Sequence, residues 1–173
     1  MSHHVLMKLG DLFKIIILGW ACPLVLVVVI HLFTPDPHQP KESFPSATFV
    51  PSSIQVAEKT ESQGADYFEL WLHNPNGQSY FHRDPNPEPI ANLKQKIPMG
   101  VSLKTIYSPA REGNVLLEIK AVGAEGEPAL SFDKKMSEYA FKRQVVHILA
   151  GVWFALGTLY FMAARRRENL TSA

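Results

Sequence analysis

Residues 145–164, VVHILAGVWFALGTLYFMAA, form an uncharged stretch that ends at three consecutive arginines, Arg165, Arg166 and Arg167. As an α-helix, these 20 residues would extend about 30 Å, the thickness of the hydrocarbon core of a bilayer. A second stretch, residues 15–33, reads IIILGWACPLVLVVVIHLF and is also uncharged. The pair predicts two transmembrane helices, and therefore an integral membrane protein.

Composition limits what the remaining residues can form. At 173 residues, the chain has room for one modest domain beside its predicted helices. The single cysteine, Cys22, lies in the first apolar stretch, so no intramolecular disulfide can form. The net charge of +1 creates no field that would recruit nucleic acid. The predicted partners are therefore the lipid bilayer and another membrane protein or a second copy of the chain, with no nucleic acid.

Changes in composition along the chain predict its organisation. Residues 1–14 form a tail, and residues 15–33 form the first membrane helix. Pro23 is expected to kink that helix or loosen one turn. Residues 34–46 hold four prolines and predict a stiff linker. A β-rich domain follows at 47–129, then a helix at 130–164 that continues into the second membrane span at 145–164, and a basic tail at 165–173.

The β-rich domain is predicted from alternation and turn signals. Residues 67–73, YFELWLH, alternate between apolar and polar side chains, and NPNG at 74–77 predicts a tight turn into a return strand at 78–82. Further strands are expected at 48–50, 54–56, 101–107 and 115–119, with a short helix at 90–97. The predicted fold class is an α+β membrane protein, in which two transmembrane helices flank a small antiparallel, barrel-like domain with one short helix.

A short motif carries a resemblance to a known family. Residues from Ile97 to Pro109, IPMGVSLKTIYSP, are followed by VLLE at 115–118. This run resembles a bacterial family of two-span membrane proteins whose small β-rich middle domain has no known function. The chain departs from the family pattern at 111–113, where REG stands in place of a second proline. The resemblance implies bacterial origin and an accessory or sensing role, and it supplies no catalytic residues.

Basic residues near the predicted helices indicate their orientation. The tails and the ends of the intervening loop each carry five lysines and arginines, which is a tie under the positive-inside rule. Lys8 and Lys14 precede the first helix, and Lys41 alone follows it closely, so the first helix favours a cytoplasmic N-terminus. Both termini are therefore expected in the cytoplasm, with the middle domain outside the inner (plasma) membrane.

Histidines are the candidate ligand residues. His31 and His147 fall at the loop-side ends of the two apolar stretches, so antiparallel helices would place them at similar depth. One interpretation is that they share a metal, haem or proton site. The other is that each side chain extends to the lipid headgroups. His73, His82 and Asp84 flank the predicted hairpin. They would form either a metal site or, as we expect, exposed strand residues. Neither a metal nor a cofactor is assigned.

Small residues in the second apolar stretch suggest a helix contact. Gly151, Ala155 and Gly157 would allow another helix to approach closely. This helix-packing interface would contact either the first span or a partner helix.

These features predict a non-enzymatic accessory subunit or interaction module of a larger membrane complex. No nucleophile elbow or phosphate-binding glycine loop is present in the sequence. One alternative is a stand-alone envelope sensor whose β-rich domain binds a ligand or an extended peptide at a sheet edge. A further alternative is a haem or redox protein that uses His31 and His147.

Overall fold

The computed structural model describes residues 17–60 and 66–171. The chain divides into two compact units. The helical unit comprises Met1–Asp36 and Glu138–Ala173, and the β unit comprises Pro37–Ser137.

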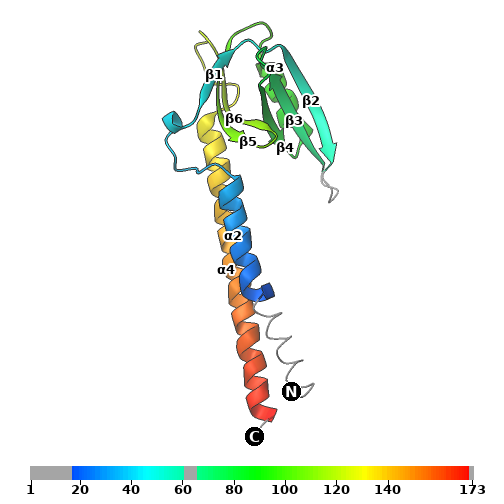
Figure 1. Cartoon of the computed structure of the whole chain (residues 1–173), viewed down its shortest axis with the longest axis vertical. Coiled ribbons are helices and arrows are strands. Elements are labelled where there is room, and N and C mark those ends of the chain that lie inside the picture. Colours follow the sequence, from blue (N-terminus) through cyan, green and yellow to red (C-terminus); the bar gives the residue numbers. More distant parts are fainter. Residues whose placement is uncertain (1–16, 61–65, 172–173) are drawn as a thin grey trace. The chain divides into compact units, whose positions relative to one another are not determined.

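A six-stranded mixed sheet forms the β unit, with strand order β1-β5-β6-β4-β3-β2 (Figure 1). All neighbouring strands are antiparallel except β4 and β6, which pair in parallel. The strands are β1 (Ser46–Phe49), β2 (Ser53–Thr60), β3 (Asp66–His73), β4 (Ser79–Asp84), β5 (Leu103–Ala110) and β6 (Gly113–Ala121).

The hairpin predicted at residues 67–82 is confirmed. Strands β3 and β4 pair from Phe68 opposite Asp84 to His73 opposite Ser79. Gly77 takes a φ of 83° in the turn, and its N–H donates to Asn74 O at 2.9 Å. Glycine accepts this left-handed conformation without a steric cost, which is why the turn can be read from local sequence.

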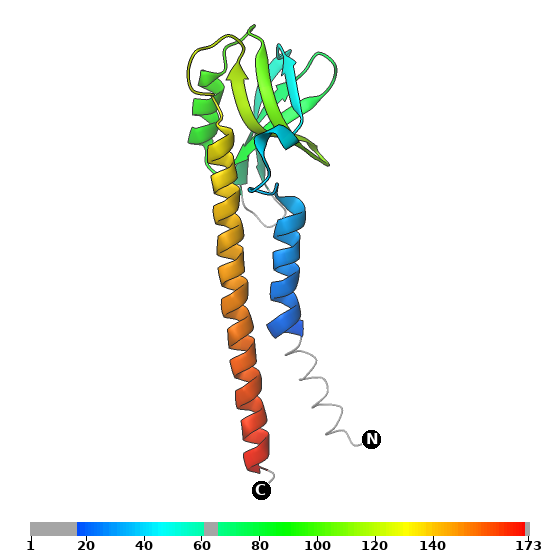
Figure 2. The same cartoon turned by 90° about the vertical axis from the view of Figure 1, so that its left-hand side faces the viewer.

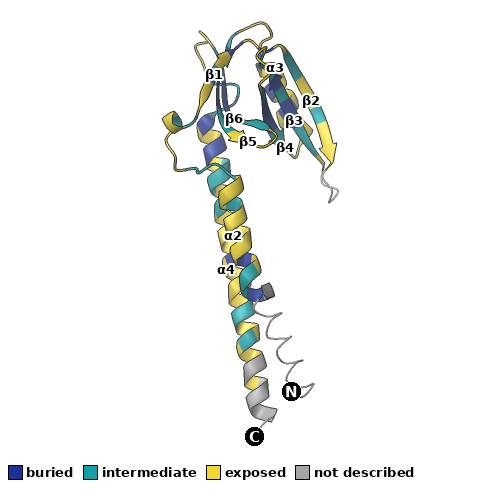
Figure 3. Ribbon diagram, in the orientation of Figure 1, coloured by how far each residue is buried: buried dark blue, intermediate teal, exposed yellow. Residues whose placement is uncertain are grey.

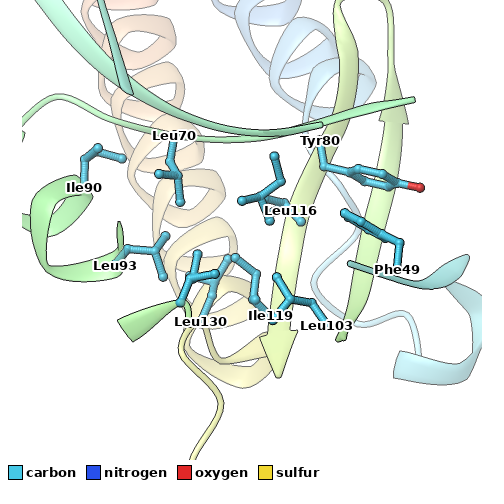
Figure 4. Close-up of a cluster of buried hydrophobic side chains, with 11 residues drawn as sticks. Phe49, Leu70, Tyr80, Ile90, Leu93, Leu103, Leu116, Ile119 and Leu130 are labelled. Carbon is cyan, nitrogen blue, oxygen red and sulfur yellow. The ribbon is translucent and has the colours of Figure 1, made fainter. Parts of the chain in front are cut away.

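Helix α3 (Pro87–Lys96) forms the connection between β4 and β5 and covers one side of the sheet (Figure 2). Proline is favoured at the start of a helix because it needs no N–H partner there. Ile90 and Leu93, three residues apart, point into the core. The core lies between α3 and the concave face of the sheet (Figure 4). Its buried members include Phe49, Leu70, Leu72, Tyr80, Leu103, Leu116, Ile119 and Leu130.

The described residues of the helical unit form two helices that lie side by side (Figure 2). A π-helical turn, η1 (Ile17–Ala21), leads into α2 (Cys22–Phe33), and α4 (Phe132–Thr171) runs through the boundary between the units. Pro23 has no N–H to donate to the carbonyl four residues before it, so an α-helical bond is missing where the π turn ends. This agrees with the expectation that Pro23 loosens one turn.

The predicted pair of transmembrane helices is wrong for the described chain. Within residues 17–60 and 66–171, α4 alone is long and apolar enough to cross a membrane, over Phe132–Ala163. The other apolar helix, Gly19–Phe33, is shorter and extends about 22 Å at 1.5 Å per residue. It ends because Thr34 takes an extended conformation before a proline. Residues 15 and 16 of the predicted first span lie outside the described residues.

The predicted antiparallel, barrel-like sheet is also wrong, because one pair of strands is parallel. The sheet has six strands, and Tyr80 and Phe81 of β4 pair in parallel with Asn114 and Val115 of β6. The cause is the crossover through α3. The chain leaves β4, passes over the core, and forms β5 beyond the position of β6, so that β6 returns alongside β4 in the same direction.

Candidate functional site

The contacts between α2 and α4 follow a repeat along α4. The contacting residues are spaced alternately four and three apart, as in a helix that keeps one face toward a partner. Arg143, His147, Phe154, Gly157 and Phe161 contact residues between Gly19 and Thr34, and Ala150 is buried at the remaining position of the repeat; these six residues are named here the seam. Trp20 fills the seam at one end, with its ring centroid 6.1 Å from that of Phe154 and 5.8 Å from that of Phe161.

Of the three small residues predicted as a helix interface, only Gly157 lies in the seam. A Cβ added to Gly157 would lie 2.9 Å from Gly19 Cα, so the two backbones touch. A Cβ added to Gly151 would meet nothing within 4 Å, and Ala155 is exposed. Gly151 and Ala155 lie about 120° and 160° around the helix from Gly157 at 3.6 residues per turn. They therefore form a separate face of α4.

Arg143 binds the C-terminal end of α2. Its Nη2 donates to Thr34 O at 3.0 Å, and its Nε donates to Thr34 Oγ1 at 3.2 Å. Its Nη1 lies 3.4 Å from Asp36 Oδ1. A cation at the carbonyl end of a helix is favourable because those carbonyls lack partners within the helix. In the sequence, Arg143 is one of the five basic residues at the ends of the intervening loop, and nothing local predicts its contact with Thr34.

His31 and His147 meet as parallel rings, with centroids 5.1 Å apart and planes inclined by 9°. His31 Nδ1 lies 2.9 Å from Val27 O, a distance at which the ring N–H donates to that carbonyl. The nitrogen lone pairs of imidazole lie in the ring plane, so two stacked rings do not direct them at one ion 2.0–2.1 Å away. No group of three or more potential metal-ligating side chains occurs in the part of the chain that the structure describes.

The structure separates the histidines of the first hairpin. His73 lies on the convex face of the sheet, where its Nδ1 is 2.9 Å from Ser79 Oγ. His82 is buried and stands opposite Leu70, on the concave face. The expectation that His82 is exposed is wrong. Asp84 accepts a hydrogen bond from Asn86 N at 2.9 Å and so shapes the loop before α3.

A buried carboxylate is the main polar feature of the β unit. Glu69 lies in the middle of β3 with 0% of its side chain exposed. Its Oε1 accepts from Arg83 Nε at 2.9 Å and Nη2 at 2.7 Å. Its Oε2 accepts from Trp71 Nε1 at 2.9 Å and lies 2.9 Å from Lys59 Nζ. Glu69, Lys59, Trp71 and Arg83 are named here the Glu69 cluster.

Two opposing effects set the ionisation of Glu69. Burial raises the pKa of its carboxyl, but hydrogen bonds from Lys59, Arg83 and Trp71 outweigh burial and hold that pKa below its ordinary value. The hydrogen bond from Lys59 to Glu69 raises the pKa of Lys59 in turn. The pair is therefore charged at neutral pH.

Aromatic rings enclose the Glu69 cluster. Lys59 Nζ lies 5.3 Å from the centroid of the Trp71 ring, and the Arg83 guanidinium lies 4.1 Å from that of Tyr67. Because Lys59 is on β2, Glu69 on β3 and Arg83 on β4, the cluster ties three strands together. Alternation alone predicted Glu69 to be an ordinary polar residue. Only the cross-strand register shows that two cations flank it.

Comparisons with known proteins give one structural likeness. No protein-family model matches the chain, and no curated protein matches it. The chain is similar to the second OB-fold domain of replication protein A from Methanococcus maripaludis, with 10% identity and a TM-score of 0.32. The match covers 49% of this chain and 88% of that one. The prediction that excluded nucleic acid does not stand beside this likeness, and we withdraw it.

Proposed function

We propose that the chain is a non-enzymatic accessory protein, anchored in the bacterial inner membrane by α4, that binds another membrane protein. The observation that supports this proposal is the exposure of α4. Only 6% of its most apolar 18-residue window is buried. An apolar helix in the core of a water-soluble domain would be covered by its own chain.

Most of the described part of α4 is exposed (Figure 3), and many of its exposed side chains are large and apolar. Each large apolar side chain exposed to water forgoes about 1.5–3 kcal/mol of burial free energy. A bilayer, or a bilayer together with a partner helix, removes that cost. The exposed residues include Phe141, Ile148, Leu149, Val152, Leu156, Leu159 and Met162.

The proposed orientation places the three arginines that follow the apolar stretch in the cytoplasm and the β unit outside. It can be tested by cysteine labelling, because Cys22 is the only native cysteine. In a Cys22→Ser background, an impermeant maleimide should label Glu125→Cys in intact cells. It should label Ser172→Cys only after the cells are permeabilised. The reverse pattern would refute this orientation.

The proposed contact with a partner helix is the face of α4 that contains Gly151 and Ala155. The contact of α4 with the π turn before α2 uses Gly157 and leaves Gly151 and Ala155 exposed. In a bilayer the hydrophobic effect does not drive helices together, because the lipid tails are as apolar as the side chains. Helices therefore associate where small residues let their backbones approach closely.

Purification from native membranes tests the proposed function. A tagged chain in mild detergent should bring one membrane protein with it at constant stoichiometry. Gly151→Leu with Ala155→Leu should remove that companion. The control is Ala163→Leu, which adds one leucine at an exposed position on another side of α4. Absence of a companion, or equal loss with the control, would refute the proposal.

A further inference from the structure

Strand β2 is an edge of the sheet, and among the described residues no strand pairs with its outer side. It pairs with β3 along all eight of its residues, from Ser53 opposite His73 to Thr60 opposite Asp66, and it is the last strand in the sheet order. In Figure 1, β2 is the outermost strand, with β3 on one side only. An edge of this length presents a row of main-chain donors and acceptors to any extended chain.

The register identifies which groups face outward. Asn74 N donates to Gln78 O at 2.8 Å, and these residues continue the β3–β4 ladder by one pair. Because hydrogen-bonded and non-hydrogen-bonded pairs alternate, even-numbered residues of β3 bond to β4 and odd-numbered residues bond to β2. The partners of those odd-numbered residues, such as Gln55 and Ala57, are also odd.

The even-numbered residues of β2 therefore direct their N–H and C=O groups away from the sheet. Among residues 17–60 and 66–171, no backbone hydrogen bond joins Ile54, Val56 or Glu58 to any element other than β3. The strand contains no proline, and its ladder with β3 has no bulge. Two common means of blocking an edge are thus missing.

The side chains of these outward-bonding residues define a chemical pattern. Val56 stands opposite the buried Leu70, yet it is 44% exposed, so its apolar surface is only half covered. Glu58 stands opposite Phe68, is exposed, and forms no ion pair with any described residue. An unpaired charge at an edge repels a second apolar strand and favours a strand that brings a cation.

The edge is also held in place. Lys59 is bonded to Glu69 on the convex face, and Thr60 Oγ1 donates to Asp66 Oδ1 at 2.7 Å. At the other end of β2, Ser52 N donates to His73 O at 2.8 Å. A strand that is already ordered before binding loses less conformational entropy when another strand pairs with it.

We propose that β2 binds an extended segment of the protein partner, which adds to the sheet as an antiparallel strand. The segment carries a basic residue opposite Glu58 and an apolar residue opposite Val56. The inference rests on the proposed function, because it names the chemistry of the partner that the accessory protein recognises. Main-chain bonds supply the affinity of such an added strand, and the alternate side chains supply its specificity.

A synthetic peptide, TKTVTIT, is the probe. In antiparallel register its Lys, Val and Ile would face Glu58, Val56 and Ile54. The full chain in detergent micelles is titrated with the peptide, and amide hydrogen exchange is followed residue by residue by NMR. When the free peptide concentration is ten times its Kd, amide exchange at Ile54, Val56 and Glu58 should slow about tenfold. The charge-reversed peptide TETVTIT should have a several-fold smaller effect.

Two variants make the test specific to the edge. Val56→Pro removes an outward N–H that the ladder with β3 does not use, and should abolish the protection at Ile54 and Glu58. Val56→Thr is the matched control and should retain it. Glu58→Lys should reverse the preference between the two peptides. Unchanged exchange at Gln55 and Ala57 shows that each variant keeps β2 paired with β3.

Two results would overturn the inference: no slowing with either peptide at millimolar concentration, or full protection in Val56→Pro. The peptide experiment needs no companion protein. If TKTVTIT does not bind while a companion still co-purifies, the edge proposal fails and the proposed function stands. If TKTVTIT binds but no companion exists, the proposed function fails and the edge remains a peptide site.

Discussion

Gly19 and Gly157 lie in backbone contact, so close that a Cβ on Gly157 would stand 2.9 Å from Gly19 Cα. Gly19 belongs to the π turn before Pro23, and Gly157 belongs to the middle of α4. Neither can carry a larger side chain unless the backbones move apart, because the atoms in the way are backbone atoms.

Gly157→Leu should therefore weaken the pairing of α2 with α4. Overpacking of this kind costs about 1–3 kcal/mol, so amide exchange along α2 should accelerate by about tenfold or more. The measurement is hydrogen exchange of the full chain in detergent. Gly151→Leu is the control, because open space surrounds that position. Equal acceleration by both variants would show that the seam does not hold the helices together.

Arg143→Ala should release the C-terminal turn of α2. The guanidinium binds both oxygens of Thr34, and alanine removes both of these bonds. We expect faster amide exchange over the last turn of α2, with a loss of about 1–2 kcal/mol in local stability. Arg143→Lys should recover part of that loss, since lysine keeps the charge but not the planar fork. Exchange equal to that of the unmodified chain in both variants would contradict the assignment.

Glu69→Gln should destabilise the β unit. The substitution keeps the size of the side chain but leaves the cations of Lys59 and Arg83 without their carboxylate. We expect a loss of about 2–3 kcal/mol in the free energy of unfolding. This is at or below the low end of the losses typical of a broken buried ion pair, because Lys59 and Arg83 are both partly exposed. Urea denaturation can be followed by Trp71 fluorescence after Trp20 and Trp153 are replaced by Phe. Glu112→Gln, at an exposed acidic partner of Arg83, is the control.

The pH dependence of stability should carry the signature of the same pair. The folded pKa of Glu69 is lowered, so its contribution is complete above about pH 4.3, the ordinary value, and is lost as pH falls through the folded pKa. The folded pKa of Lys59 is raised, so its contribution is complete below about pH 10.4 and is lost as pH rises through the folded value.

The measurement is the difference in unfolding free energy between the unmodified chain and Glu69→Gln across pH. That difference should be constant between about pH 5 and pH 10 and should shrink on both sides. A difference that stays constant to pH 2 would refute the charged state of Glu69. One that grows on acidification would refute the direction of its pKa shift.

Local chemistry was sufficient to predict several elements. The Asn-Pro-Asn-Gly turn and the alternation before it predict the β3–β4 hairpin, since backbone preferences act over a few residues. The apolar stretch from Val145 predicts the long part of α4 in the same way, because composition alone sets its preference for an apolar medium. Pro23 predicts a loosened turn because its missing N–H is a property of one residue.

Tertiary structure decided what depends on partners distant in the chain. Alternation assigns Glu69 to the polar face of β3, but only pairing with β2 and β4 brings Lys59 and Arg83 to it and buries it. From the sequence, Gly151, Ala155 and Gly157 are equally good candidates for a helix contact. In the structure, Gly157 is the one of the three that lies against the backbone of Gly19. The parallel pairing of β4 with β6 depends on the crossover through α3. The local sequence determines where helices, strands and turns form, because those preferences act over a few residues. Which strands and helices lie next to one another depends on how the whole chain buries its core, so the tertiary structure decides it.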